Sequence, residues 1–259
     1  MEQPDYTLLD IPEIIQFMFY PRADWQPPPP GATDHRFPVG EGVHLTGRLY
    51  PHSEDAPSIL FFHGNGEVAS DYDDIAPLYH EAGVNLFVVD YRGYGRSEGT
   101  PTVSTMVSDT HAIMDAFCGI LDREGYAGRV YVMGRSLGAY CAVELAARYP
   151  SRIEGLITES GSAAISRVLS YFDLRRDPAV DELEQRHREK VRGITIPLLV
   201  IHGDQDTLVP IELGRDLYDS VSSAEKRFVT IEGAGHNDIM DIGRKRYFQA
   251  IKEFVFASR

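Results

Sequence analysis

The amino-acid sequence predicts an α/β fold in which helices cover both faces of a mostly parallel sheet. Short apolar segments recur along the chain at residues 59–62, 85–89, 129–133, 153–158, 197–201 and 227–231. Helical patterns fall between most of these segments, and in residues 106–121 the apolar side chains recur at helical spacing. Near-continuous apolar strands that alternate with helices are typical of parallel sheets buried on both faces.

The N-terminal part of the chain is predicted to lie outside this alternation. Residues 8–20 carry apolar side chains at helical spacing, and residues 27–31 are four prolines and a glycine. We therefore expect residues 1–33 to form a helix and a proline-rich linker that pack on a core domain of residues 34–259. A membrane-surface anchor is the alternative for the helix, but its acidic residues and lack of lysine disfavour it.

The core domain is expected to begin with an antiparallel hairpin. Residues 35–39 and 43–49 are strand-like, and the turn Gly40-Glu41-Gly42 joins them. Further along, residues 161–193 contain no strand pattern but have charged helical stretches and the aromatic pair Tyr171-Phe172. Because this interval follows the carboxyl end of a strand, we expect it to form a short helical lid over the sheet.

Composition excludes several classes of function. The formal net charge of −14 argues against nucleic acid and anionic membranes as partners. Two cysteines, Cys118 and Cys141, give no disulfide framework. No segment is long and apolar enough to span a bilayer, and the first residues lack the features of a signal peptide, which predicts a cytoplasmic protein. The sequence does not predict the oligomeric state.

Motifs for metals and cofactors are missing from the sequence. It contains neither His-Glu-x-x-His nor paired Cys-x-x-Cys motifs. The glycines between Gly93 and Gly99 have no phosphate-binding lysine and do not open a helix. We therefore expect neither a metal ion nor a cofactor.

A serine lies between two glycines at the end of one predicted strand. The pattern Gly134-Arg135-Ser136-Leu137-Gly138 follows the apolar residues 129–133 and precedes an alanine-rich helical segment. A strand, sharp turn and helix around Gly-x-Ser-x-Gly form a nucleophile elbow, in which a strained backbone exposes the serine hydroxyl. Strand and helix pass close together there, which explains the small residues on both sides. We predict that Ser136 is a nucleophile.

A nucleophilic serine needs a base, and the base needs an orienting carboxylate. Catalytic groups of parallel α/β sheets collect on loops beyond the carboxyl ends of the strands. The loop after residues 197–201 offers Asp204 and Asp206, and the loop after residues 227–231 offers His236. The order serine, aspartate, histidine is the one expected for such a fold.

Four segments together resemble the α/β-hydrolases, and more narrowly the Bem46-type and ABHD17-like serine hydrolases. They are residues 62–66 (FHGNG), 90–97 (DYRGYGRS), 134–138 (GRSLG), and 202–210 (HGDQDTLVP) with Gly235-His236. The resemblance implies an α/β-hydrolase fold and favours Asp206 over Asp204 as the acid, with Asp204 stabilising its loop. It also implies that the backbone amides of Asn65 and Leu137 form the oxyanion hole, in agreement with the need of a tetrahedral intermediate for N–H donors. His63 and His202 are expected to be structural, as are Arg135 and the loop of residues 90–97.

The sequence thus predicts a serine hydrolase that cleaves carboxylic esters or thioesters through an acyl-enzyme, with a small molecule or an acylated protein as substrate. The resemblance itself suggests removal of fatty acyl groups from proteins, and a small-molecule carboxylesterase is the parallel reading. An aminopeptidase would need carboxylates for the substrate amine, and the acidic residues near the oxyanion turn are explained more simply as a solvated helix start. A non-catalytic ligand-binding protein of the same fold is the alternative from another class.

Overall fold

The computed structural model describes residues 4–174 and 177–257. Its eight strands form one sheet with the order β1-β2-β4-β3-β5-β6-β7-β8. The first two strands pair antiparallel, β2 is antiparallel to β4, and all remaining pairs are parallel. The predicted α/β architecture with an N-terminal hairpin is therefore confirmed. The strands are β1 (Thr33–Gly40), β2 (Val43–Tyr50), β3 (Ser58–Phe62), β4 (Asn85–Val89), β5 (Val130–Arg135), β6 (Gly155–Glu159), β7 (Leu198–Gly203) and β8 (Lys226–Ile231).

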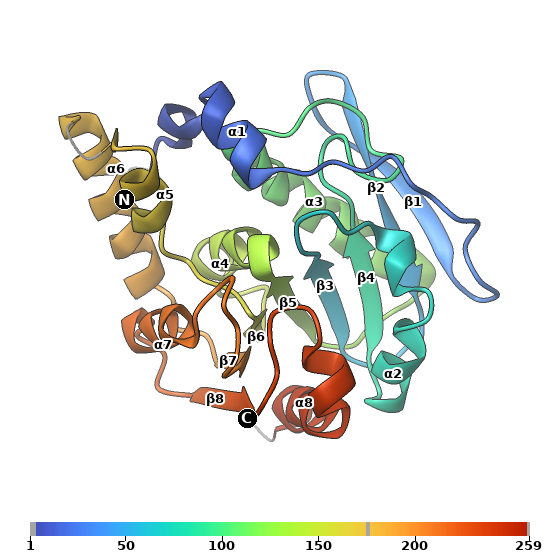
Figure 1. Ribbon diagram of the computed structural model, residues 1–259. Coiled ribbons are helices and arrows are strands. Elements are labelled where there is room, and N and C mark those ends of the chain that lie inside the picture. Colours follow the sequence, from blue (N-terminus) through green and yellow to red (C-terminus); the bar gives the residue numbers. More distant parts are fainter. Residues whose placement is uncertain (1–3, 175–176, 258–259) are drawn as a thin grey trace.

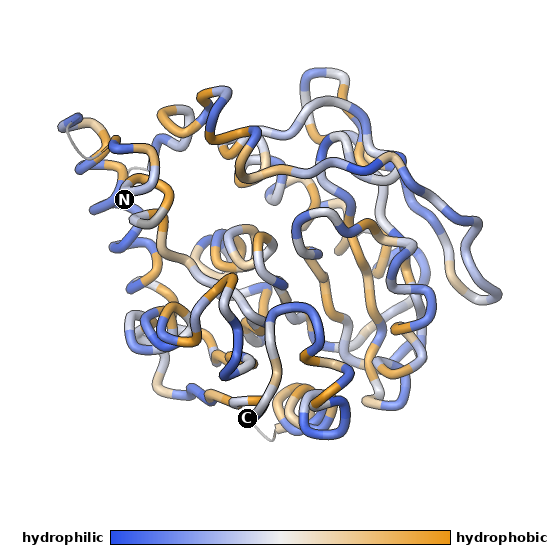
Figure 2. The backbone as a smooth tube through the Cα atoms, viewed as in Figure 1, coloured by the Kyte–Doolittle hydropathy of each residue, from blue (hydrophilic) through white to orange (hydrophobic). Residues whose placement is uncertain are grey.

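Helices cover both faces of the sheet (Figure 1). One apolar core lies between the sheet and the helices α3 and α4. A second apolar core lies between the other face of the sheet and the helices α2 and α8. Figure 2 shows the apolar residues concentrated along the central strands, which are buried on both faces. The helices are α1 (Pro12–Met18), α2 (Ala76–Glu81), α3 (Val103–Glu124), α4 (Ala139–Arg148), α5 (Ser166–Tyr171), α6 (Pro178–Arg192), α7 (Ile211–Ser220) and α8 (Ile239–Val255), with short 3₁₀ turns η1 (Tyr6–Leu9), η2 (Ala69–Tyr72) and η3 (Ser136–Gly138).

The N-terminal helix differs from the expectation. The pattern of residues 8–20 predicts one continuous helix, whereas the chain forms η1, a break at Asp10 and Ile11, and then α1. Pro12 explains the break, because proline has no N–H to donate and is tolerated at the first position of a helix rather than inside one. The helix ends before Phe19, whose backbone is extended. The division of the chain at residue 33 and the lid over residues 161–193 stay predictions.

A buried polar chain attaches α6 to the rest of the molecule. Lys190 Nζ lies 2.6 Å from a carboxylate oxygen of Glu144 and 2.5 Å from the hydroxyl of Tyr6. The Tyr6 hydroxyl lies 2.7 Å from His187 Nδ1, and His187 Nε2 contacts the carbonyl of Ala163. An ammonium that donates to Tyr6 leaves the tyrosine to donate to Nδ1, so His187 is neutral with its proton on Nε2. Burial, with the charge of Lys190, lowers the pKa of His187 to about 3.

Acid is therefore expected to destabilise the fold through His187. Its folded-state pKa lies below the ordinary value of 6.5, so the unfolded chain binds the extra proton as the pH falls below 6.5 and stability is lost down to about pH 3. At pH 5 the loss from this residue amounts to about 2 kcal/mol. Urea denaturation at pH 7.5 and pH 5 should show a smaller pH difference for His187→Gln than for the wild type. The exposed His52 provides the control, and an unchanged pH difference in His187→Gln would contradict the prediction.

Candidate active site

The serine of the predicted elbow lies between β5 and α4. Ser136 has a φ of +50°, a left-handed backbone conformation that is costly for a residue with a side chain. A Cβ atom on Gly134 would lie 2.3 Å from the carbonyl oxygen of Gly138, and one on Gly138 would lie 2.1 Å from that of Phe62. Only glycine fits at these two positions, because the end of β5 passes close to the start of the helix and Gly138 passes close to the backbone at the end of β3.

Ser136, His236 and Asp206 form one continuous line of hydrogen bonds. His236 Nε2 lies 2.9 Å from Ser136 Oγ, and its Nδ1 lies 2.8 Å from Asp206 Oδ2. The Asp206 side chain is fully buried, and its other oxygen accepts from the amides of Leu208 and Val209. A carboxylate at Nδ1 keeps the proton on that nitrogen, which leaves Nε2 free to accept from the serine hydroxyl.

The other candidate residues of the sequence have hydrogen-bond partners of their own, and His202 Nε2 also lies 3.5 Å from Asp206 Oδ2. Asp204 Oδ1 accepts from the amide of Gly233 at 2.7 Å, so this carboxylate holds two loops together. His202 Nε2 contacts the carbonyl of Val209 at 2.7 Å. His63 is buried, with Nδ1 2.8 Å from the carbonyl of Gly64. The structure thus brings Asp206, and not Asp204, to the imidazole of His236.

Asn65 and Leu137 line the same cleft as Ser136. Leu137 follows the serine in η3, and Asn65 lies in the turn after β3. The side-chain oxygen of Asn65 accepts from the Tyr20 amide and from the Tyr94 hydroxyl, both at 2.8 Å. Within the described ranges, the backbone amide of Asn65 donates to no acceptor. An amide in this position is available to a substrate oxygen.

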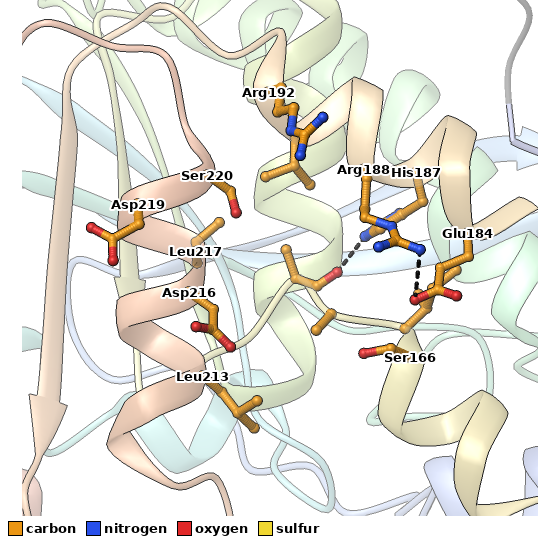
Figure 3. A pocket seen from close by; sticks show the side chains of 14 residues that line it. Ser166, Glu184, His187, Arg188, Arg192, Leu213, Asp216, Leu217, Asp219 and Ser220 are labelled. Carbon is orange, nitrogen blue, oxygen red and sulfur yellow. Dashed lines mark hydrogen bonds and ion pairs between the residues drawn. The ribbon is translucent and has the colours of Figure 1, made fainter.

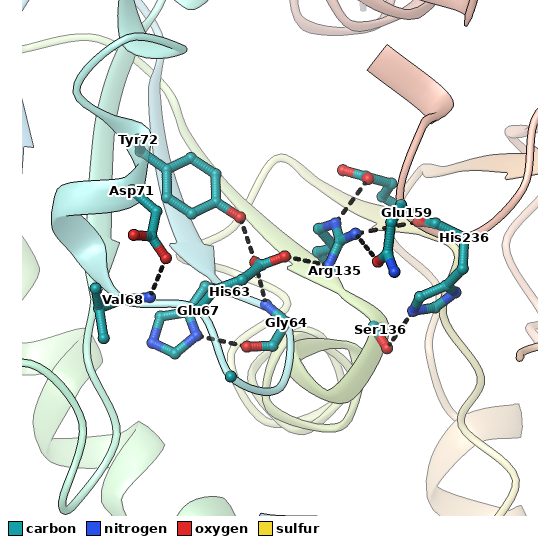
Figure 4. Close-up of polar contacts among 12 residues, drawn as sticks. His63, Gly64, Glu67, Val68, Asp71, Tyr72, Arg135, Ser136, Glu159 and His236 are labelled. Carbon is teal, nitrogen blue, oxygen red and sulfur yellow. Dashed lines mark hydrogen bonds and ion pairs between the residues drawn. The ribbon is translucent and has the colours of Figure 1, made fainter. Parts of the chain in front are cut away.

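A buried arginine links the loops that carry these groups (Figure 4). Arg135 forms ion pairs with Glu67, in the turn after β3, and with Glu159, at the end of β6. Its Nη2 donates to the carbonyl of His236 at 3.1 Å and to the side chain of Asn237 at 3.0 Å. One guanidinium therefore connects the serine turn, the turn after β3 and the loop of His236, which is the loop-fixing role expected of Arg135.

The carboxylates of Glu67 and Glu159 have further hydrogen-bond partners. Glu67 accepts from the amide of Gly64 and from the hydroxyl of Tyr72, both at 2.8 Å. Glu159 accepts from the hydroxyl of Tyr247 at 2.6 Å. Burial raises the pKa of the Glu159 carboxyl, and the charge of Arg135 opposes this shift. Sequence reasoning missed Glu159, because the predicted strand ended one residue before it.

The cleft has a volume of about 410 Å³ and a predominantly apolar lining, within the range of small-molecule sites. Both α1 and α5 contribute to it, and sequence reasoning missed this contribution of α1. The signal in the sequence was the aromatic pair Tyr171-Phe172, which by itself does not indicate a contact with residues 8–20. The lining residues are Phe17, Met18, Asn65, Ser136, Leu137, Tyr140, Ser162, Ala164, Val168, Tyr171, Leu208, Val209 and Leu213.

A second pocket of about 300 Å³ lies between α6 and α7 (Figure 3). Charged side chains of both helices line it, among them Arg188 and Arg192 of α6 and Asp216 and Asp219 of α7. It shares Ala164 and Leu213 with the cleft, but Ser136 is not among its lining residues.

Residues 4–174 and 177–257 contain no cluster of three histidine, cysteine or acidic side chains that could hold a metal ion. Within the same ranges, none of the helices combines the length and the apolar character that crossing a bilayer requires.

The fold and this site define a hydrolase of the α/β-hydrolase class, and comparison with known proteins identifies the family. The family model described as "Serine aminopeptidase, S33" (Hydrolase_4) matches residues 53–174 and 180–242. These residues are well over half of the chain, and the chain therefore belongs to this family.

Relatives and solved structures agree with this class. Human alpha/beta hydrolase domain-containing protein 17B is 32% identical over 203 residues, which cover 76% of this chain and 66% of the human protein. An uncharacterized protein of Mycobacterium tuberculosis is 29% identical over 232 residues, covering 87% and 80%. Est1E of Butyrivibrio proteoclasticus, solved with ferulic acid, has a TM-score of 0.71 at 23% identity and covers 85% of this chain and 97% of its own. The Pyrococcus furiosus esterase Pf2001 has a TM-score of 0.69 at 19% identity, covering 91% and 98%. The resemblance stated from the sequence motifs is confirmed.

Proposed function

We propose that the protein is a serine hydrolase that cleaves carboxylic esters or thioesters through an acyl-enzyme. The observation that carries the proposal is the hydrogen-bonded line from buried Asp206 through His236 to Ser136. Its serine end opens into an apolar cleft, where an acyl group can bind. The protein's cytoplasmic location is a separate prediction that derives from the sequence.

The geometry suits each step of acyl transfer. Ser136 Oγ attacks the acyl carbonyl carbon while His236 Nε2 takes the hydroxyl proton, and Asp206 stabilises the imidazolium that forms. The negative charge on the carbonyl oxygen is stabilised by the amides of Asn65 and Leu137. His236 then gives its proton to the leaving alcohol or thiol. In the second half-reaction it activates a water that attacks the acyl-serine, and Ser136 leaves with its proton restored.

The lining of the cleft favours ester or thioester substrates over peptides with a free amino terminus. An aminopeptidase must hold an ammonium group, and none of the described residues that line the cleft is acidic. The nearby carboxylates are engaged elsewhere: Glu67 pairs with Arg135, Asp71 with Arg22, and Asp73 with Arg48. We therefore place aminopeptidase activity behind ester hydrolysis, although the family description names it.

Labelling with a fluorophosphonate probe tests the proposal against a non-catalytic binding protein. Such probes react with a serine that a neighbouring base activates, and peptide mapping should place the label on Ser136. The Ser136→Ala variant should take up no label. Folded wild-type protein that neither reacts with the probe nor hydrolyses p-nitrophenyl acetate would overturn the proposed function.

A further inference from the structure

Two helices far apart in the sequence meet over the cleft that contains Ser136. The ring of Phe17 in α1 stacks on that of Tyr171 in α5, with centroids 4.8 Å apart and planes inclined by 22°. Phe17 also contacts the ring of Phe172 edge-on, at 5.5 Å. Phe17 and Tyr171 both line the cleft, and Figure 1 shows α1 and α5 on the same side of the molecule, beside α4. The stacked pair forms a roof that closes one side of the cleft.

The two rings of the roof are much more exposed to solvent than the aromatic rings of the core. Phe17 is 54% exposed and Tyr171 is 71% exposed, whereas the aromatic rings of the core are buried. The remaining apolar lining beneath them includes Met18, Val168 and Leu213. An apolar ligand in the cleft would cover the inner faces of these side chains, and removing that surface from water is favourable.

The position of α1 is fixed relative to the site by the segment that follows it. The backbone amide of Tyr20 donates to the side chain of Asn65 at 2.8 Å and lies 2.9 Å from the hydroxyl of Tyr94. Arg22 donates to the carbonyl of Gly66 at 2.8 Å and pairs with Asp71. The segment after α1 is therefore tied to the turn that carries the Asn65 amide, and this tie positions α1, with Phe17, beside the cleft.

The orientation of the cleft assigns it to the acyl side of the substrate. A leaving group must lie against His236, which returns the proton to it. Among the described residues that line the cleft, Ser136 is present and His236 is absent. The space under the aromatic roof therefore belongs to the acyl group. It begins at the attacked carbon and extends away from the departing alcohol or thiol.

We propose that Phe17 and Tyr171 are specificity-determining residues that cover the acyl chain of the substrate and select medium-chain acyl groups over acetyl groups. This inference rests on the proposed hydrolase function. The N-terminal segment is then part of the active site, because α1 provides one half of the roof.

The chain-length profile of p-nitrophenyl esters tests this inference. Phe17→Ala and Tyr171→Ala should each lower kcat/KM for the octanoate about tenfold, which corresponds to the contact of roughly two buried methylene groups. The loss of kcat/KM for the acetate should be several-fold smaller, because an acetyl group does not reach the roof, and Tyr171→Phe should retain the wild-type ratio of octanoate to acetate hydrolysis. The matched control is Phe256→Ala. That ring is 52% exposed and packs near Gly83, at the amino-terminal edge of the sheet.

Each other outcome overturns the assignment of the roof. Equal losses on both esters would assign the pair a structural role, and no loss on either would show that the acyl chain lies elsewhere. A gain on the octanoate would show that the rings block the cleft. Failure of the underlying hydrolase proposal is distinguishable, because the wild type would then hydrolyse neither ester, or Ser136→Ala would still hydrolyse both.

Discussion

Replacing Ser136 by alanine is expected to lower kcat for ester hydrolysis by at least about 10⁴-fold, since the variant keeps the cleft but has no nucleophile. Removing the hydroxyl costs the fold little, because among the described residues Ser136 Oγ is hydrogen-bonded to the imidazole of His236 alone. Steady-state hydrolysis of p-nitrophenyl acetate and a thermal melt measure the two effects. We expect the midpoint of unfolding to stay within a few degrees of the wild type, about 1 kcal/mol or less in stability.

Two sets of variants distinguish a catalytic role of Ser136, His236 and Asp206 from a general disturbance of the fold. His236→Ala should lose a similar factor, and the double variant with Ser136→Ala should lose no more than either single one, because the two groups act as a unit. Asp206→Asn should lower kcat about 10⁴-fold. Asp204→Asn, in the same loop but bonded to Gly233, should retain most of the activity. Multiplicative losses, or equal losses for the two aspartates, would contradict the assignment.

The fold could be predicted because its central strands have little structural freedom. Residues 59–62 and 86–89 are apolar at every position, and a short segment of that kind has few arrangements other than a doubly buried parallel strand. The positions of Asp206 and His236 follow from the same architecture, since parallel strands bring the loops at their carboxyl ends to one edge of the sheet.

Features that depend on distant contacts could not be predicted in this way. The helical periodicity of residues 8–20 identifies an apolar face but does not say that Phe17 stacks on Tyr171. The pattern around Gly134 and Gly138 predicts a tight turn, whereas the partners of Arg135 come from β6 and the loop before α8. Local spacing contains no information on these pairings, because they form only when the layers pack.

Replacing Arg135 by methionine is expected to destabilise the fold by about 3–5 kcal/mol, the usual cost of removing one partner from a buried ion pair. The Glu159 side chain is fully buried, and without the guanidinium its charge would be stabilised only by the hydroxyl of Tyr247. Its folded-state pKa would rise further above the unfolded value. The folded chain then keeps a proton that the unfolded chain releases, so stability is lost as the pH rises through this window. Urea denaturation at pH 5 and pH 8 should show the larger destabilisation at pH 8.

A second substitution identifies the cause of that loss. In the double variant Arg135→Met with Glu159→Gln the uncompensated charge is gone, so part of the stability and most of the added pH dependence should be recovered. Activity should not return, because the carbonyl of His236 still lacks the donor that fixes the histidine loop. Arg152→Met is the matched control: its guanidinium is over one-third exposed and pairs with exposed Asp115, and such pairs contribute about 0–1 kcal/mol. If Arg135→Met unfolds at the same urea concentration as Arg152→Met, the buried arginine does not hold the three loops together. The loops that carry Ser136, Asp206 and His236 must then keep these side chains in line without it.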